Sequence, residues 1–77
     1  MARIEQFSRG HLQRTSLHDP IDATYYTYEV DGRRLLQINT AGRSDSVMPG
    51  KVSQSIQLDE GSALQLFSIL KSHFGFH

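Results

Sequence analysis

ATYYTYEVDGRRLLQINT, residues 23–40, is the stretch that decides the fold of this chain. Tyrosine and threonine fill its first half, and both suit the pleated surface of a β-strand. Asp31-Gly32 separates the two halves, and this dipeptide favours a type I′ turn, in which both central residues have positive φ. The stretch therefore predicts an antiparallel hairpin with strands at residues 23–30 and 33–40.

The sequence that follows predicts one more strand and then a helix. Residues 52–58, VSQSIQL, alternate between apolar and polar side chains and are typical of a strand. Asp59 stands where a helix N-cap belongs, and Gly75 stands where a helix ends in a left-handed residue. Apolar residues between them recur at helical spacing and form one stripe: Ala63, Leu66, Phe67, Leu70 and Phe74.

The remaining segments carry weaker signals. Residues 2–7 alternate briefly and favour a short strand, whereas residues 8–22 mix glycine, proline and charged residues without a period. Residues 41–51 are rich in small residues and read as a loop. We predict one α+β domain over residues 1–77: an N-terminal strand or arm at 1–22, an antiparallel β-sheet of about four strands completed by 23–58, and a C-terminal helix at 59–75.

The length of the chain limits what it can do. A domain of 77 residues buries only about 60% of the surface that its unfolded chain exposes. The chain has no cysteine, so disulfides cannot compensate for a thin core, and we expect a homodimer instead. No dinucleotide fingerprint, P-loop or nucleophile elbow is present. We therefore expect no enzyme activity and no cofactor.

The sequence also indicates neither a metal-binding site nor a membrane-spanning segment. The four histidines match no common zinc-binding spacing, and a site built from His18, Asp19 and Asp22 is less favoured than a solvated loop. No apolar stretch approaches the roughly 18 residues of a membrane helix. Residues 1–13 lack the apolar centre of a secretory signal, so we expect a cytoplasmic protein without a membrane partner.

The formal net charge of zero conceals a patchwork along the chain. Residues 19–31 carry a net charge of −4, while residues 32–58 carry +3. A local patch of charged residues can therefore produce an electrostatic field that the net charge of the whole chain does not reveal.

Alternation along the strands divides the sheet into two expected faces. One face should lie against the helix and the other should be polar and nearly uncharged. The expected helix-side residues are Tyr26, Tyr28, Val30, Leu36, Ile38, Val52, Ile56 and Leu58. The expected polar-side residues are Tyr25, Thr27, Glu29, Leu35, Gln37, Asn39, Ser53, Ser55 and Gln57.

The expected polar face fits two kinds of protein. Tyr25 could stack on a base, neutral amides and hydroxyls could bond to base edges, and the flanking turns supply cations for phosphates. Those cations are Arg33, Arg34, Arg43 and Lys51. An ordinary antiparallel sheet with one solvated face has the same pattern, so both interpretations stay open.

Residues 27–70, and above all the segment MPGKVSQSIQLDEGSALQL at 48–66, resemble the transcriptional coactivator PC4 family of single-stranded DNA-binding proteins. The shared features are a strand, a glycine turn, a second strand, a basic glycine loop, a third strand and an acidic helix start. The resemblance implies a curved antiparallel sheet, a homodimer whose helices help form the interface, and DNA across the open sheet face. The residues that it assigns to binding are Arg33, Arg34, Gln37, Arg43, Lys51 and Ser53.

Two hypotheses follow. The first is a nonenzymatic module that binds single-stranded DNA or RNA. The same stretch also looks like small bacterial and prophage proteins, so the alternative is a protein-interaction or regulatory module that docks on a larger enzyme and has no nucleic-acid ligand.

Overall fold

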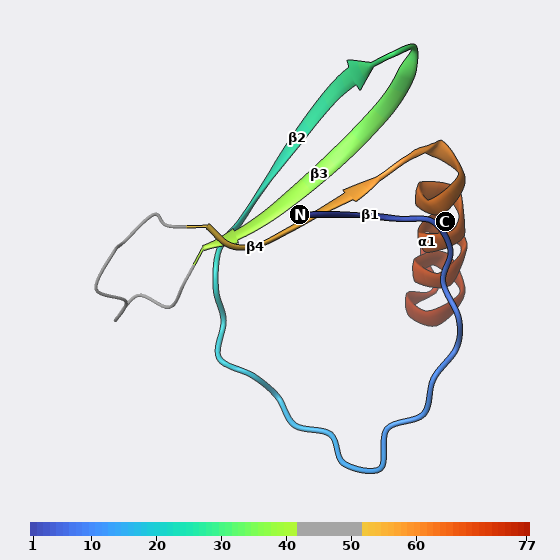
Figure 1. Ribbon diagram of the computed structural model, residues 1–77. Helices are drawn as coiled ribbons and strands as arrows, with labels where there is room; N and C mark the ends of the chain where they lie inside the picture. Colours follow the sequence, from blue (N-terminus) through green and yellow to red (C-terminus); the bar gives the residue numbers. More distant parts are fainter. Residues whose placement is uncertain (42–51) are drawn as a thin grey trace.

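The computed structural model describes residues 1–41 and 52–77 and contains one sheet followed by one helix (Figure 1). The described elements are the strands β1 (Ala2–Ile4), β2 (Ala23–Val30), β3 (Arg33–Ala41) and β4 (Val52–Leu58) and the helix α1 (Glu60–Phe74). The α+β class, the four strands and the C-terminal helix agree with the prediction from the sequence.

The predicted hairpin is present as β2 and β3. Asp31 has φ 52° and Gly32 has φ 77°, so both central residues of the turn have the positive φ that a type I′ turn requires. The strands pair antiparallel from Val30 opposite Arg33 to Ala23 opposite Thr40. The hairpin prediction is therefore confirmed, with β3 one residue longer than expected.

The sheet is mixed, which corrects the prediction of a purely antiparallel sheet. Its strand order is β1-β4-β3-β2; β3 pairs antiparallel with β2 and β4, whereas β1 pairs parallel with β4. Residues 5–22 connect β1 to β2 at the opposite edge and run around one side of the molecule (Figure 1). Because no tight turn joins β1 to the strand beside it, nothing local imposes an antiparallel direction.

The helix α1 has both of its predicted caps. Ser62 N–H donates to Asp59 Oδ1 at 3.0 Å, and Asp59 N–H donates to Ser62 Oγ at 3.1 Å. This reciprocal capping box satisfies donors that the first turn of a helix leaves free. At the other end, Gly75 adopts the left-handed conformation, and its N–H donates to the Lys71 carbonyl at 2.9 Å.

The cap makes a pH-dependent contribution to stability. The hydrogen bond from the Ser62 backbone N–H holds the pKa of Asp59 below its ordinary value of 3.8, and the Ser62 hydroxyl, Arg3 and Arg33 act in the same direction against desolvation. Because the folded pKa is lowered, this stabilisation is present above pH 3.8 and is lost as the pH falls through the folded pKa.

Asp59→Ala should therefore lower the melting temperature at neutral pH, and the difference from the wild type should shrink at acidic pH. Asp59→Asn is the matched control, because asparagine also caps helices and should keep most of the neutral-pH stability. Thermal unfolding followed by circular dichroism at both pH values measures this. Equal melting of Asp59→Ala and the wild type at neutral pH would show that the cap contributes nothing.

The core lies at one end of the sheet, where α1 begins. Leu58 is 1% exposed and is the only buried apolar side chain among the described residues. Leu36 on β3 and Ile4 on β1 lie directly opposite it in the register. Beyond this cluster α1 extends away from the strands instead of lying across them (Figure 1). The thin core predicted from the chain length is therefore confirmed.

Within residues 1–41 and 52–77, no helix is both long enough and apolar enough to cross a membrane.

Candidate nucleic-acid interface

The strand register decides which side chains share a face. Residues directly opposite each other in a sheet point to the same side. Tyr26 is opposite Gln37, and Gln37 is opposite Gln57, so all three lie on one side. We call this side the polar face and define it by Tyr26, Tyr28, Gln37, Asn39, Ser55 and Gln57.

The register corrects the predicted faces of β2. Tyr25 lies opposite Ile38, and Thr27 lies opposite Leu36, so both belong to the other side of the sheet. The reason is the two-residue turn, which places Val30 opposite Arg33 and thereby fixes every later pair of the hairpin. We call this second side the apolar face and define it by Ile4, Tyr25, Leu36, Ile38, Ile56 and Leu58.

The predicted division of β3 and β4 is confirmed for the residues that the register pairs. Gln37 and Asn39 share a side with Gln57 and Ser55, respectively. The prediction was wrong for the whole of β2, because it assigned the two sides of this strand the wrong way round. Its misassigned residues are Tyr25, Thr27 and Glu29, expected on the polar side, and Tyr26, Tyr28 and Val30, expected on the helix side. The polar face consequently has two tyrosines, where one was expected.

A hydrogen-bond network links the polar face across three strands. Tyr28 Oη donates to Gln37 Oε1 at 2.6 Å and accepts from Gln57 Nε2 at 2.6 Å. Gln37 Nε2 donates to Asn39 Oδ1 at 2.9 Å and to Ser55 Oγ at 3.2 Å. Ser55 Oγ in turn donates to Asn39 Oδ1 at 2.6 Å. These bonds orient neutral amides and hydroxyls on the surface without placing a carboxylate among them.

One row of the polar face crosses all four strands. The register places Arg3 of β1 beside Gln57 of β4, Gln57 beside Gln37 of β3, and Gln37 beside Tyr26 of β2. The row therefore runs from a cation through two amides to Tyr26, a residue that is 48% exposed. We call it the cross-strand row.

Arg3 and Arg33 together line a hollow at one end of the polar face. The hollow has a volume of about 510 Å³ and also includes Gln57 and Asp31 in its lining. Both arginines act on the carboxylate of Asp59, whose pKa they help to lower. The positive charge at this end is therefore partly offset by neighbouring carboxylates, which predicts a weak, salt-sensitive anion site.

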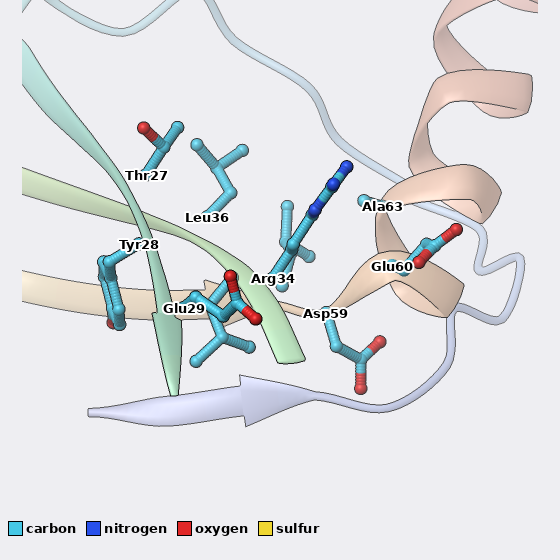
Figure 2. A pocket seen from close by; sticks show the side chains of 10 residues that line it. Thr27, Tyr28, Glu29, Arg34, Leu36, Asp59, Glu60 and Ala63 are labelled. Carbon is cyan, nitrogen blue, oxygen red and sulfur yellow. The ribbon is translucent and has the colours of Figure 1, made fainter. Parts of the chain in front are cut away.

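The register places the two neighbouring arginines of the turn on opposite sides of the sheet, although both also line one hollow beside the start of α1. Arg33 lies opposite Val30 on the side of the polar face, whereas Arg34 lies opposite Glu29 on the side of the apolar face. In Figure 2, Arg34 extends toward the start of α1 near Ala63, while Tyr28 points the other way. Arg34 therefore does not lie beside the cross-strand row, although the resemblance assigned Arg34 to nucleic-acid binding.

The other predicted binding residues are placed as follows. Gln37 lies at the centre of the hydrogen-bond network. Ser53 lies within β4. Arg43 and Lys51 lie outside the described residues, so their predicted role stays a prediction. Arg3, Tyr26 and Tyr28 were missed by the sequence analysis; counting pairs outward from Asp31-Gly32 would have found the two tyrosines.

Neither metal-binding residues in the described part of the chain nor a similar known protein indicates what this site binds. Residues 1–41 and 52–77 contain no group of three or more histidine, aspartate or glutamate side chains that could hold a metal ion. Comparison of the chain with protein-family models, curated proteins and solved structures finds no match. The functional argument therefore depends on the geometry of the polar face.

Proposed function

We propose that the protein is a nonenzymatic, cytoplasmic module that binds single-stranded DNA or RNA on its polar face. The observation that carries this proposal is the cross-strand row, in which Arg3, Gln57, Gln37 and Tyr26 lie side by side. A strand of nucleic acid offers phosphates, base edges and base faces, and the row has a matching group for each.

The chemistry of each position supports a particular contact. The guanidinium groups of Arg3 and Arg33 can bind phosphate oxygens in a bidentate manner. The exposed ring of Tyr26 offers a surface on which a base can stack. Gln37 and Gln57 are held by hydrogen bonds to Tyr28, so their orientation is set before a base arrives. Preorganised groups lose less entropy on binding.

The resemblance to the PC4 family is part of this proposal. The order of hairpin, third strand and C-terminal helix on which the resemblance rests is the order of β2, β3, β4 and α1. The parallel pairing of β1 departs from the fully antiparallel sheet that the resemblance implies. Arg3, which β1 adds to the polar face, is thus a feature of this chain and not one carried over from the family.

The proposal is tested by titrating a labelled single-stranded oligonucleotide with the protein at several salt concentrations. Two phosphate contacts, from Arg3 and Arg33, should give a slope of log K against log salt of about −1.4, because a single strand contributes about −0.7 per contact. Participation of Arg43 and Lys51 would make the slope steeper. Absence of binding at low salt would overturn the proposal.

The double variant Arg3→Ala with Arg33→Ala should weaken binding at least about tenfold, because hydrogen bonds to charged groups contribute about 1.5–3 kcal/mol each. Arg9→Ala with Arg14→Ala is the matched control: it removes the same charge from the exposed segment between β1 and β2. Circular dichroism checks that both variants keep their fold. Equal loss in the two variants would show that the attraction is diffuse and that the polar face is not the site.

A further inference from the structure

The outer edge of β2 carries backbone groups that no neighbouring strand pairs. Within the part of the chain that the structure describes, β2 is the last strand of the sheet and pairs with β3 alone (Figure 1). Hydrogen-bonded and non-hydrogen-bonded residue pairs alternate along an antiparallel ladder. The Ala41 N–H donates to the Asp22 carbonyl at 3.5 Å, which shows where this alternation begins. The N–H and C=O groups of every second residue from Ala23 to Glu29 therefore point away from β3.

This edge lacks most of the features by which native proteins prevent a further strand from pairing. Those features are shortness, proline, bulges and charged side chains along the strand. β2 has eight residues, pairs with β3 in an unbroken register, and contains no proline and one charged residue, Glu29. At the opposite edge of the sheet, β1 has three residues and is a much shorter template. A strand added to this sheet therefore has its best partner in β2.

Acidic residues stand at both ends of this edge. Asp19 and Asp22 precede β2, Glu29 lies near its end and Asp31 follows in the turn, and all four are exposed. Residues 19–31 contain no lysine, arginine or histidine. A partner strand with cations at its ends complements these charges, whereas nucleic-acid phosphates are repelled. Pairing of two copies of β2 brings acidic ends together in either strand direction, which disfavours a second copy at this edge.

We propose that β2 binds an extended, basic segment of a partner protein, which becomes a fifth strand of the sheet. Backbone hydrogen bonds supply the affinity in this mode of recognition, and alternate side chains supply the specificity. On one side of the sheet the added side chains lie beside Tyr26 and Tyr28, and on the other side they lie beside Tyr25. Uncharged β-branched or aromatic residues suit these neighbours. The partner segment is thus basic at its ends and uncharged between them.

This inference does not depend on the nucleic-acid proposal. The backbone groups at the edge of β2 lie in the plane of the sheet, whereas the side chains of the polar face stand out from that plane. The two surfaces are therefore separate. If the protein binds a basic peptide but no oligonucleotide, only the proposed function fails.

Titration of the wild-type protein with a synthetic fluorescent peptide is the first test. The probe has two lysines at each end of about six alternating threonines and valines, which matches the length of β2 at about 3.3 Å per residue. It should bind saturably, and more weakly as salt is added. A control peptide with glutamates in place of the lysines should bind at least about tenfold more weakly. Absence of binding by the lysine peptide at low salt, or equal binding of both peptides, would overturn the proposal.

Amide hydrogen exchange then locates the bound strand on the protein. The lysine peptide should slow exchange of the outward amides of Tyr25 and Thr27 at least about tenfold, because these groups gain hydrogen bonds. The amides of Tyr26 and Tyr28 are the control within the same strand, since they already bond to β3, and their exchange should change less. Unchanged exchange of the outward amides in the presence of bound peptide would place the contact elsewhere and contradict the proposal.

Thr27→Pro tests the edge by substitution. Proline removes an outward N–H from β2 and no hydrogen bond to β3, so peptide binding should weaken by about 2- to 12-fold while circular dichroism shows an intact fold. Thr15→Pro makes the same change in the exposed segment between β1 and β2 and should leave peptide binding unchanged. Equal peptide affinity in the two variants would show that the edge of β2 is not the site.

Discussion

Leu58→Ala is expected to remove a large share of the free energy of unfolding of the protein. Truncating a fully buried leucine costs about 2–5 kcal/mol, and a chain of this length has about 4–12 kcal/mol of stability in total. Leu58 is the buried centre of the cluster that joins β1, β3 and β4, so no second core compensates for the cavity. Urea unfolding followed by circular dichroism measures the loss.

Leu17→Ala is the matched control for this experiment. The same side chain is removed, but Leu17 is 101% exposed in the segment between β1 and β2. Its truncation should change the free energy of unfolding by less than about 0.5 kcal/mol. If Leu58→Ala were as mild as Leu17→Ala, the position of the core in this account would be wrong.

Tyr26→Leu is expected to weaken oligonucleotide binding by about 5- to 150-fold. A base stacked on an aromatic ring contributes about 1–3 kcal/mol, and leucine keeps the apolar bulk without the π-face. Because no charge is removed, the salt slope should stay as it is in the wild type. Fluorescence anisotropy at several salt concentrations measures both quantities.

The adjacent Tyr25→Leu separates the two faces of the same strand. Tyr25 lies opposite Ile38 on the apolar face, so its replacement should leave oligonucleotide affinity within about twofold of the wild type, while leucine preserves the apolar contact. A larger loss in Tyr25→Leu than in Tyr26→Leu would restore the face assignment first expected from the sequence and contradict the present one.

The difference between the two tyrosines shows what the sequence could and could not predict. Asp31-Gly32 forms a turn with positive φ, which is a local feature, so the hairpin could be predicted from these two residues. Asp59 caps the helix with its side chain, which is also local, so the helix start could be predicted from this residue. The run TYYTY has tyrosine at both even and odd positions and no contrast between apolar and polar residues, so alternation within β2 did not reveal which of its side chains join the polar face. Only the pairing across the turn did.

The position of β1 in the sheet could not be predicted from the neighbouring sequence alone. Its three residues contain one large apolar side chain, Ile4, and its partner β4 lies some fifty residues away. The position of β1 therefore depends on pairing such as that of Ile4 with Leu58, which is a contact between distant segments. For the same reason Arg3 was not predicted as part of the site, although it stands at one end of the cross-strand row.

The central claim, that the polar face is the nucleic-acid interface, is tested most directly by nuclear magnetic resonance. A single-stranded oligonucleotide is added at low salt while the side-chain amide signals of Gln37, Asn39 and Gln57 are followed together with the methyl signals of Ile38 and Ile56. The two sets lie on opposite faces of the same strands. This account predicts that the amide signals shift in a saturable way and that the methyl signals do not. Shifts confined to the methyl groups, or no shift in either set, would contradict it.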